Sequence, residues 1–92
     1  MTTVIFSHGQ ESGPWGTKIR AMAELARDLG CSVDSIDYQG IADPTERVRK
    51  CVEECAAIDD EIVLVGSSMG GHVATAAAGQ VGAVGLFVLA PA

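Results

Sequence analysis

The predicted fold of this chain rests on the stretch Gly66-Ser67-Ser68-Met69-Gly70. It follows the apolar run 62–65, which is typical of a buried strand, and precedes the small-residue segment 73–78, which favours a helix. Glycines at both ends permit backbone contacts that a side chain would block. The pattern therefore predicts a strand that turns sharply into a helix, with Ser68 at the apex.

A turn of this form is a nucleophile elbow, in which strained backbone holds a hydroxyl above the edge of a sheet. We expect Gly66 to let the turn approach the neighbouring strand, and Gly70 to let the new helix pack close behind the serine. Acyl transfer by a serine also needs a base and donors that stabilise the oxyanion. Ser68 is the candidate nucleophile.

The candidate oxyanion donors are two backbone amides. The amide of Met69 follows the serine at the start of a helix, where the helix dipole adds partial positive charge. The second donor is expected in His8-Gly9-Gln10, directly after the first predicted strand. The residue after the His-Gly pair, Gln10, would offer its amide there.

Apolar runs alternate with helical patterns along the chain. Strands are predicted at 3–7, 31–37, 62–65 and 84–89, and helices at 17–29, 43–58 and 69–79. Asp43 as the cap, Pro44 at the first helical position and Glu46 as the acid of a capping box provide the start of the second helix. The first helix has one apolar face, on which these side chains are expected: Ile19, Met22, Ala23, Ala26 and Leu29. Such alternation predicts an α/β fold, a three-layer parallel sheet with helices on both faces, within a single domain over residues 1–92.

The chain carries a formal net charge of -6, which argues against nucleic acid or an anionic membrane as a partner. No apolar run reaches the roughly 20 residues that span a bilayer, and no basic segment follows Met1, so a cytoplasmic location is expected. The basic residues are expected on solvated helix faces: Lys18, Arg20, Arg27, Arg47, Arg49 and Lys50.

The three cysteines show no metal-type spacing, and neither a metal nor a cofactor is expected. Cys51 and Cys55 lie four residues apart on one face of the second predicted helix. We expect both to be small buried side chains.

The motifs, taken in order, resemble the α/β-hydrolase superfamily, in particular its small bacterial members without a large lid. The matching stretches are His8-Gly9 with Gly13-Pro14, Asp37-Tyr38, Gly66 to Gly71, and Leu89-Ala90-Pro91. The resemblance implies that Ser68 is acylated and that the amides of Met69 and Gln10 form the oxyanion hole, with His8, Gly9, Gly66 and Gly70 in support. It also implies hydrolysis of an ester, thioester or amide bond in a small-molecule substrate.

The chain departs from the family in its catalytic partners. In this superfamily an acid and then a histidine follow the nucleophile, but after Ser68 the sequence has no Asp or Glu, and its only histidine is His72. We expect His72 to pack within the elbow helix, His8 to make a structural hydrogen bond, and Asp37 to fix a loop. We therefore expect the chain to be the N-terminal half of a hydrolase of about 180 to 220 residues and to be inactive by itself.

Two other functions stay open. Gly9, Gly13 and Gly16 with Asp37 permit a dinucleotide-binding half-domain, although the glycine spacing is not the standard one. Glu11 would also lie beside the pyrophosphate, and Trp15 would crowd the start of the helix. A hydrolase-fold protein that binds without catalysis is the other.

The last predicted strand suggests a mode of self-association. Residues 84–89 are apolar, and a strand of this kind at the edge of a sheet can pair with a second copy.

Overall fold

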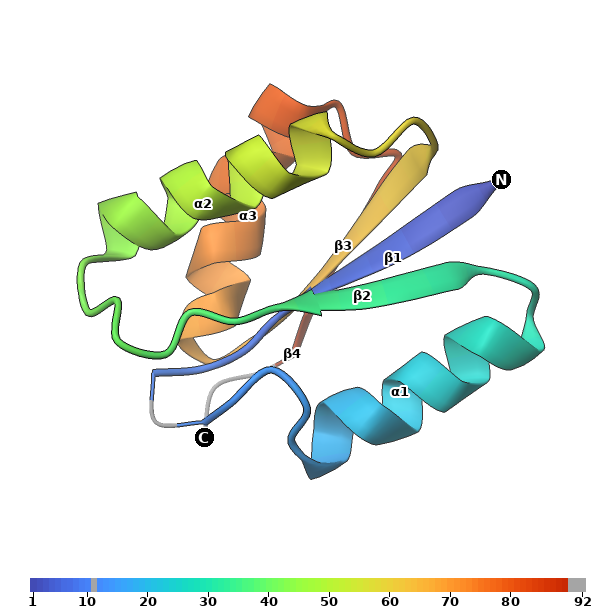
Figure 1. The fold of residues 1–92 in the computed structure, drawn as a ribbon, viewed down its shortest axis with the longest axis horizontal. Coiled ribbons are helices and arrows are strands. Elements are labelled where there is room, and N and C mark those ends of the chain that lie inside the picture. The colour runs from blue at the N-terminus through green and yellow to red at the C-terminus, as the bar shows by residue number, and fades with distance from the viewer. Residues whose placement is uncertain (11, 90–92) are drawn as a thin grey trace.

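The computed structural model describes residues 1–10 and 12–89, so expectations that concern Glu11 and the Ala90-Pro91-Ala92 end lie outside the described residues. Strands and helices alternate in the expected order (Figure 1). The elements are β1 (Thr2–Ser7), α1 (Thr17–Asp28), β2 (Ser32–Ile36), α2 (Pro44–Ala56), β3 (Glu61–Ser67), α3 (Met69–Val81) and β4 (Gly85–Leu89). None of the helices in this part of the chain is long and apolar enough to span a membrane.

The strands form one parallel sheet in the order β2-β1-β3-β4. The register places Ser7, at the end of β1, beside Ile36 of β2 and Gly66 of β3. The sheet therefore has the parallel arrangement that the sequence predicts.

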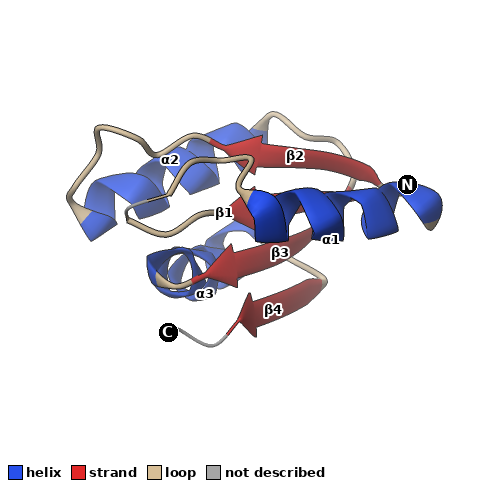
Figure 2. Cartoon of the chain, turned by 90° about the horizontal axis from the view of Figure 1, so that it is seen from below, coloured by secondary structure: helices blue, strands red, loops and turns tan. Residues whose placement is uncertain are grey.

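The central strand β1 is apolar on both faces, and helices cover both. Val4 and Phe6 of β1 pack with Ile19 and Ala23 of α1, while Ile5, between them, packs toward α2 and α3. Figure 2 shows α1 in front of the sheet and the other two helices behind it. The three-layer prediction is confirmed.

The direction of winding reverses in the middle of the sheet. From β1 the chain passes through α1 to β2 on one side, and from β3 it passes through α3 to β4 on the other. The chain therefore leaves the carboxyl ends of β1 and β3 toward opposite faces of the sheet, and a crevice of about 260 Å³ lies at this end, lined in part by Gly9 and Ser68. Residues 8–10 and 67–69 lie at these two strand ends.

Helix boundaries follow local chemistry with two differences from expectation. The carboxylate of Asp43 caps α2 by accepting a hydrogen bond of 2.9 Å from the Thr45 amide. Glu46 does not close a capping box, since its carboxylate pairs with Arg49. Leu29, expected on the buried face of α1, is 84% exposed because the helix ends at Asp28 and the chain turns away at Gly30.

β4 forms one edge of the described sheet, and apolar side chains are exposed along it. Phe87 is 63% exposed and Val88 is 50% exposed, and Val84, just before the strand, is 60% exposed. An exposed apolar edge strand can pair with another chain.

We predict that Phe87→Lys lowers self-association of the purified chain, because a charge on the edge strand opposes strand pairing. Light scattering over a concentration series measures the change. Leu29→Lys is the matched control, since it adds the same charge at an exposed leucine just after α1. Equal reduction by both variants would contradict a role of the edge strand and indicate a general effect of charge on solubility.

Candidate active site

Ser68 lies between the end of β3 and the start of α3. Its backbone has φ 55° and ψ -123°, and it is the only residue other than glycine with a positive φ among those that the structure describes. Such a conformation costs about 1–3 kcal/mol and persists only where the surroundings impose it. The strained turn leaves the Ser68 side chain exposed.

The glycines at the two ends of the elbow make room for backbone. A Cβ on Gly66 would overlap the carbonyl of Gly70 in the first turn of α3, and a Cβ on Gly70 would overlap the carbonyl of Ser7 at the end of β1. The expected roles of the two glycines are therefore interchanged. Gly66 admits the new helix, and Gly70 admits the neighbouring strand.

The buried side chain of His8 holds the loop after β1 in place. Its Nε2 accepts a hydrogen bond of 2.8 Å from the Tyr38 amide. Because Nε2 is the acceptor, the ring proton of a neutral imidazole lies on Nδ1, which donates to the Gly9 carbonyl at 2.6 Å. His8 thus fixes the backbone of its own loop.

The loop after β1 lies against the elbow. A Cβ on Gly9 would lie 3.1 Å from the Ser68 Cβ, which is closer than an ordinary van der Waals contact, so glycine suits this close approach. Beside this contact is a hollow of about 410 Å³ lined by Gln10, Ser12, Ser68 and Met69. The candidate nucleophile and both residues with candidate oxyanion amides therefore line one cavity.

Arg47 is a site residue that sequence reasoning missed. It was expected on a solvated helix face, but it is only 2% exposed. Its Nε donates to the Ile41 carbonyl at 2.6 Å and its Nη1 to the Gly9 carbonyl at 3.5 Å. The available signal was helical spacing, since Arg47 precedes the buried Cys51 by four residues and Cys55 by eight.

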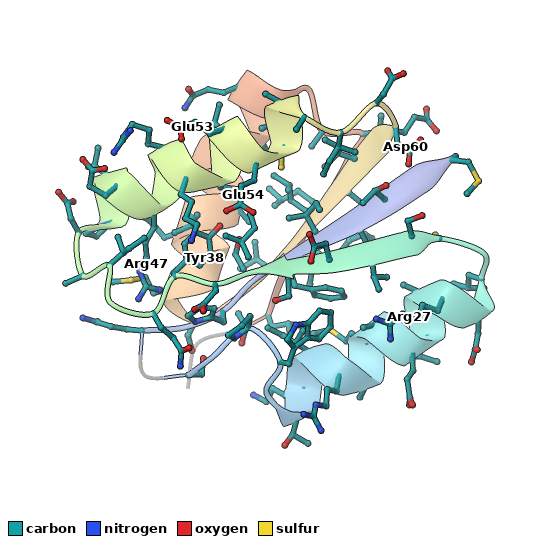
Figure 3. The ribbon with its side chains drawn as sticks, viewed as in Figure 1. Arg27, Tyr38, Arg47, Glu53, Glu54 and Asp60 are labelled. Atoms are coloured by element: carbon teal, nitrogen blue, oxygen red, sulfur yellow. The ribbon has the colours of Figure 1, made fainter. Side chains whose placement is uncertain are left out.

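Tyr38 lies beneath the guanidinium of Arg47, which is 5.4 Å from the centre of the tyrosine ring (Figure 3). Its hydroxyl shares a hydrogen bond of 2.9 Å with the Ser7 hydroxyl. Burial raises the pKa of Tyr38 well above its ordinary value, so the phenol stays neutral. Tyr38 therefore connects β1, the loop after β2 and α2 without adding charge.

This combination of a strained serine and an adjoining glycine loop at the point where the sheet reverses direction agrees with the comparison to known proteins. The sequence matches the alpha/beta hydrolase family over residues 4–92. The chain belongs to this family.

A solved structure is similar to this chain in fold and in sequence. It is a protein from Xanthomonas campestris pv. campestris assigned to the alpha/beta superfamily of hydrolases, 31% identical to this chain with a TM-score of 0.90. The alignment covers 97% of this chain and 58% of that protein, so the chain spans little more than half the length of its relative. Among curated proteins, none matches the sequence significantly.

For other titratable residues of this alpha/beta hydrolase chain, the structure confirms some expectations and contradicts one. His72 is exposed on α3, so the expectation that it packs within the helix is wrong; residue 72 falls on the face of α3 that turns away from the sheet. The Asp37 carboxylate accepts a hydrogen bond of 2.8 Å from the Gln39 amide and holds the loop after β2. Cys51 and Cys55 are buried free thiols, as expected.

We predict that Gly70→Ala destabilises the chain by at least about 3 kcal/mol or prevents folding, because the added methyl overlaps the backbone of β1. Gly79→Ala, in the same helix, is the matched control. No atom lies within 4 Å of its added Cβ, so it should stabilise by about 1 kcal/mol. Urea unfolding followed by circular dichroism measures both, and equal stabilities would contradict the close approach at residue 70.

The single tyrosine permits a test of the buried phenol. Because the pKa of Tyr38 is raised in the folded state, its contribution to stability is complete below pH ~10, the ordinary tyrosine value, and declines as the pH rises above it. Tyrosinate absorbance in the near ultraviolet should therefore appear together with unfolding seen by circular dichroism. The prediction is wrong if the phenol ionises near pH ~10 while the chain remains folded.

Proposed function

We propose that the chain supplies the nucleophile and the oxyanion hole of a serine hydrolase that cleaves ester, thioester or amide bonds through an acyl-enzyme. The observation that carries the proposal is the backbone of Ser68, a non-glycine residue at φ 55°. Such strain is retained where a site depends on it. Membership of the alpha/beta hydrolase family supports the same chemistry.

The oxyanion hole would consist of two backbone amides. Met69 is the first residue of α3, and its amide belongs to the first turn, where N–H groups have no partner within the helix. The amide of Gln10 belongs to the loop that touches the elbow through Gly9. Two donors beside the same hollow as Ser68 would suit the negative oxygen that develops when a carbonyl is attacked.

The reaction would proceed in two steps, acylation of Ser68 and hydrolysis of the acyl-enzyme. The Ser68 oxygen attacks the substrate carbonyl while a base takes the hydroxyl proton, and the base then gives this proton to the leaving oxygen, sulfur or nitrogen as the tetrahedral intermediate expels the alcohol, thiol or amine. Water attacks the acyl-enzyme while the same base takes one of its protons, and the base returns this proton to the Ser68 oxygen as the second intermediate releases the acid. In this scheme the two amides stabilise the oxyanion in both steps.

We further propose that the base and its acid partner are provided by polypeptide outside these 92 residues. The sequence holds no Asp or Glu after Ser68, and His72 is exposed on the helix that starts at the elbow. The relative from Xanthomonas is long enough to contain such a segment, since 42% of it, the complement of the aligned 58%, has no counterpart here.

The proposal is tested by covalent labelling with a fluorophosphonate. The complete gene product that contains residues 1–92 should be labelled at Ser68, with the site identified by peptide mass spectrometry. Ser68→Ala should abolish the labelling, and Ser32→Ala should preserve it, since Ser32 is an exposed serine at the opposite end of the sheet.

Labelling that survives in Ser68→Ala would overturn the assignment of the nucleophile. A complete protein that folds but neither labels nor hydrolyses activated esters would favour binding without catalysis. The chain of residues 1–92 alone is expected to show negligible ester turnover, because the base is missing.

A further inference from the structure

We propose that Arg47 is a positioning residue of the oxyanion hole, which it orients through the carbonyl of Gly9. The inference rests on the proposed function, because it assigns a role to the Gln10 amide. It concerns a residue on α2, far from the elbow in sequence, whose side chain reaches the loop after β1.

The carbonyl oxygen of Gly9 is the point where several parts of the fold converge. It accepts hydrogen bonds from His8 Nδ1 at 2.6 Å, from Ser12 Oγ at 3.4 Å and from Arg47 Nη1 at 3.5 Å. The His8 and Ser12 bonds come from the loop itself. The bond from Arg47 links the loop to α2.

The guanidinium is held rigidly in this position. Its Nε donates to the Ile41 carbonyl at 2.6 Å, and its Cζ lies over the Tyr38 ring. Tyr38 in turn donates its amide to His8 Nε2, and the two rings are 5.3 Å apart. Arg47 and His8 are therefore placed by the same tyrosine, and both donate to the same carbonyl.

The peptide bond links the anchored Gly9 carbonyl to the Gln10 amide, which is the second donor of the proposed oxyanion hole. The carbonyl of Gly9 and the N–H of Gln10 belong to one planar peptide, which is trans, so they point in opposite directions. Fixing the carbonyl against Arg47 and His8 fixes the direction of the amide. A positive charge beside the oxygen also polarises the peptide and strengthens its N–H as a donor.

The structure thus separates Arg47 from the other basic residues of α2. Arg49 is exposed and pairs with Glu46 and Glu53 on the surface of the helix. It offers a control that removes the same charge from the same helix without touching the Gly9 carbonyl.

The experiment compares Arg47→Met with Arg49→Met in the complete gene product. Removal of an oxyanion donor costs about 10² to 10³ in rate, so misdirecting one should lower kcat for an activated ester by about 10-fold to 100-fold, with KM unchanged. Arg49→Met should leave both constants unchanged. Rates are divided by the fraction of protein that fluorophosphonate can label, which corrects for misfolded material.

A second readout separates positioning from a purely structural role. Sulfur is a weaker hydrogen-bond acceptor than oxygen, so an intact oxyanion hole favours an ester over the matching thionoester. The ester-to-thionoester rate ratio should fall in Arg47→Met and stay at the wild-type value in Arg49→Met. A loss of folded protein alone would lower both rates equally and leave the ratio unchanged.

The outcomes distinguish the two proposals. An active wild type with an unchanged ratio in Arg47→Met overturns the positioning role and leaves the hydrolase proposal intact. A wild type that neither labels at Ser68 nor hydrolyses esters overturns both. Where methionine prevents folding, Arg47→Gln keeps donors in the buried site but is too short to reach both carbonyls; it should lower the ratio, and an unchanged ratio overturns the role.

Discussion

The packing of Gly70 against the carbonyl of Ser7 is the contact on which the site depends. A methyl group at residue 70 would overlap that oxygen, so the first turn of α3 touches the end of β1 without an intervening side chain. Gly66 allows the same turn to fold back on its own strand. Together these contacts force Ser68 into its positive φ and bring it beside Gly9, which places the serine next to the loop that supplies the second oxyanion donor in the proposed function.

That loop is itself fixed by groups from three parts of the chain. Tyr38, after β2, orients His8 at the end of β1, and Arg47 reaches down from α2 to the Gly9 carbonyl. All three groups lie at the carboxyl ends of β1 and β2 because parallel strands end at the same edge of the sheet. A site that uses backbone amides needs such external anchors, since an amide has no side chain of its own to hold it in place.

The position of the site also follows from topology. The crevice lies where the strand order reverses between β1 and β3, the usual place for ligands in open parallel sheets. β4 continues the sheet beyond the elbow and leaves apolar side chains exposed at its edge. The aligned region covers 58% of the Xanthomonas relative, and in the proposed function the acid and the histidine come from polypeptide that these 92 residues do not contain.

Local sequence patterns were enough to predict the order of the elements, the parallel three-layer sheet and the position of the elbow. Strand and helix periodicity, glycines and helix caps depend on only a few neighbouring residues, so they can be recognised without the tertiary structure. The sequence did not determine which contact each elbow glycine relieves, or that Arg47 is buried and His72 exposed. Those depend on which elements pack together. The prediction for Arg47 was wrong because a charged side chain on a helix is usually exposed to solvent. Its partners in the folded chain, two backbone carbonyls and the face of an aromatic ring, come together only in the tertiary structure.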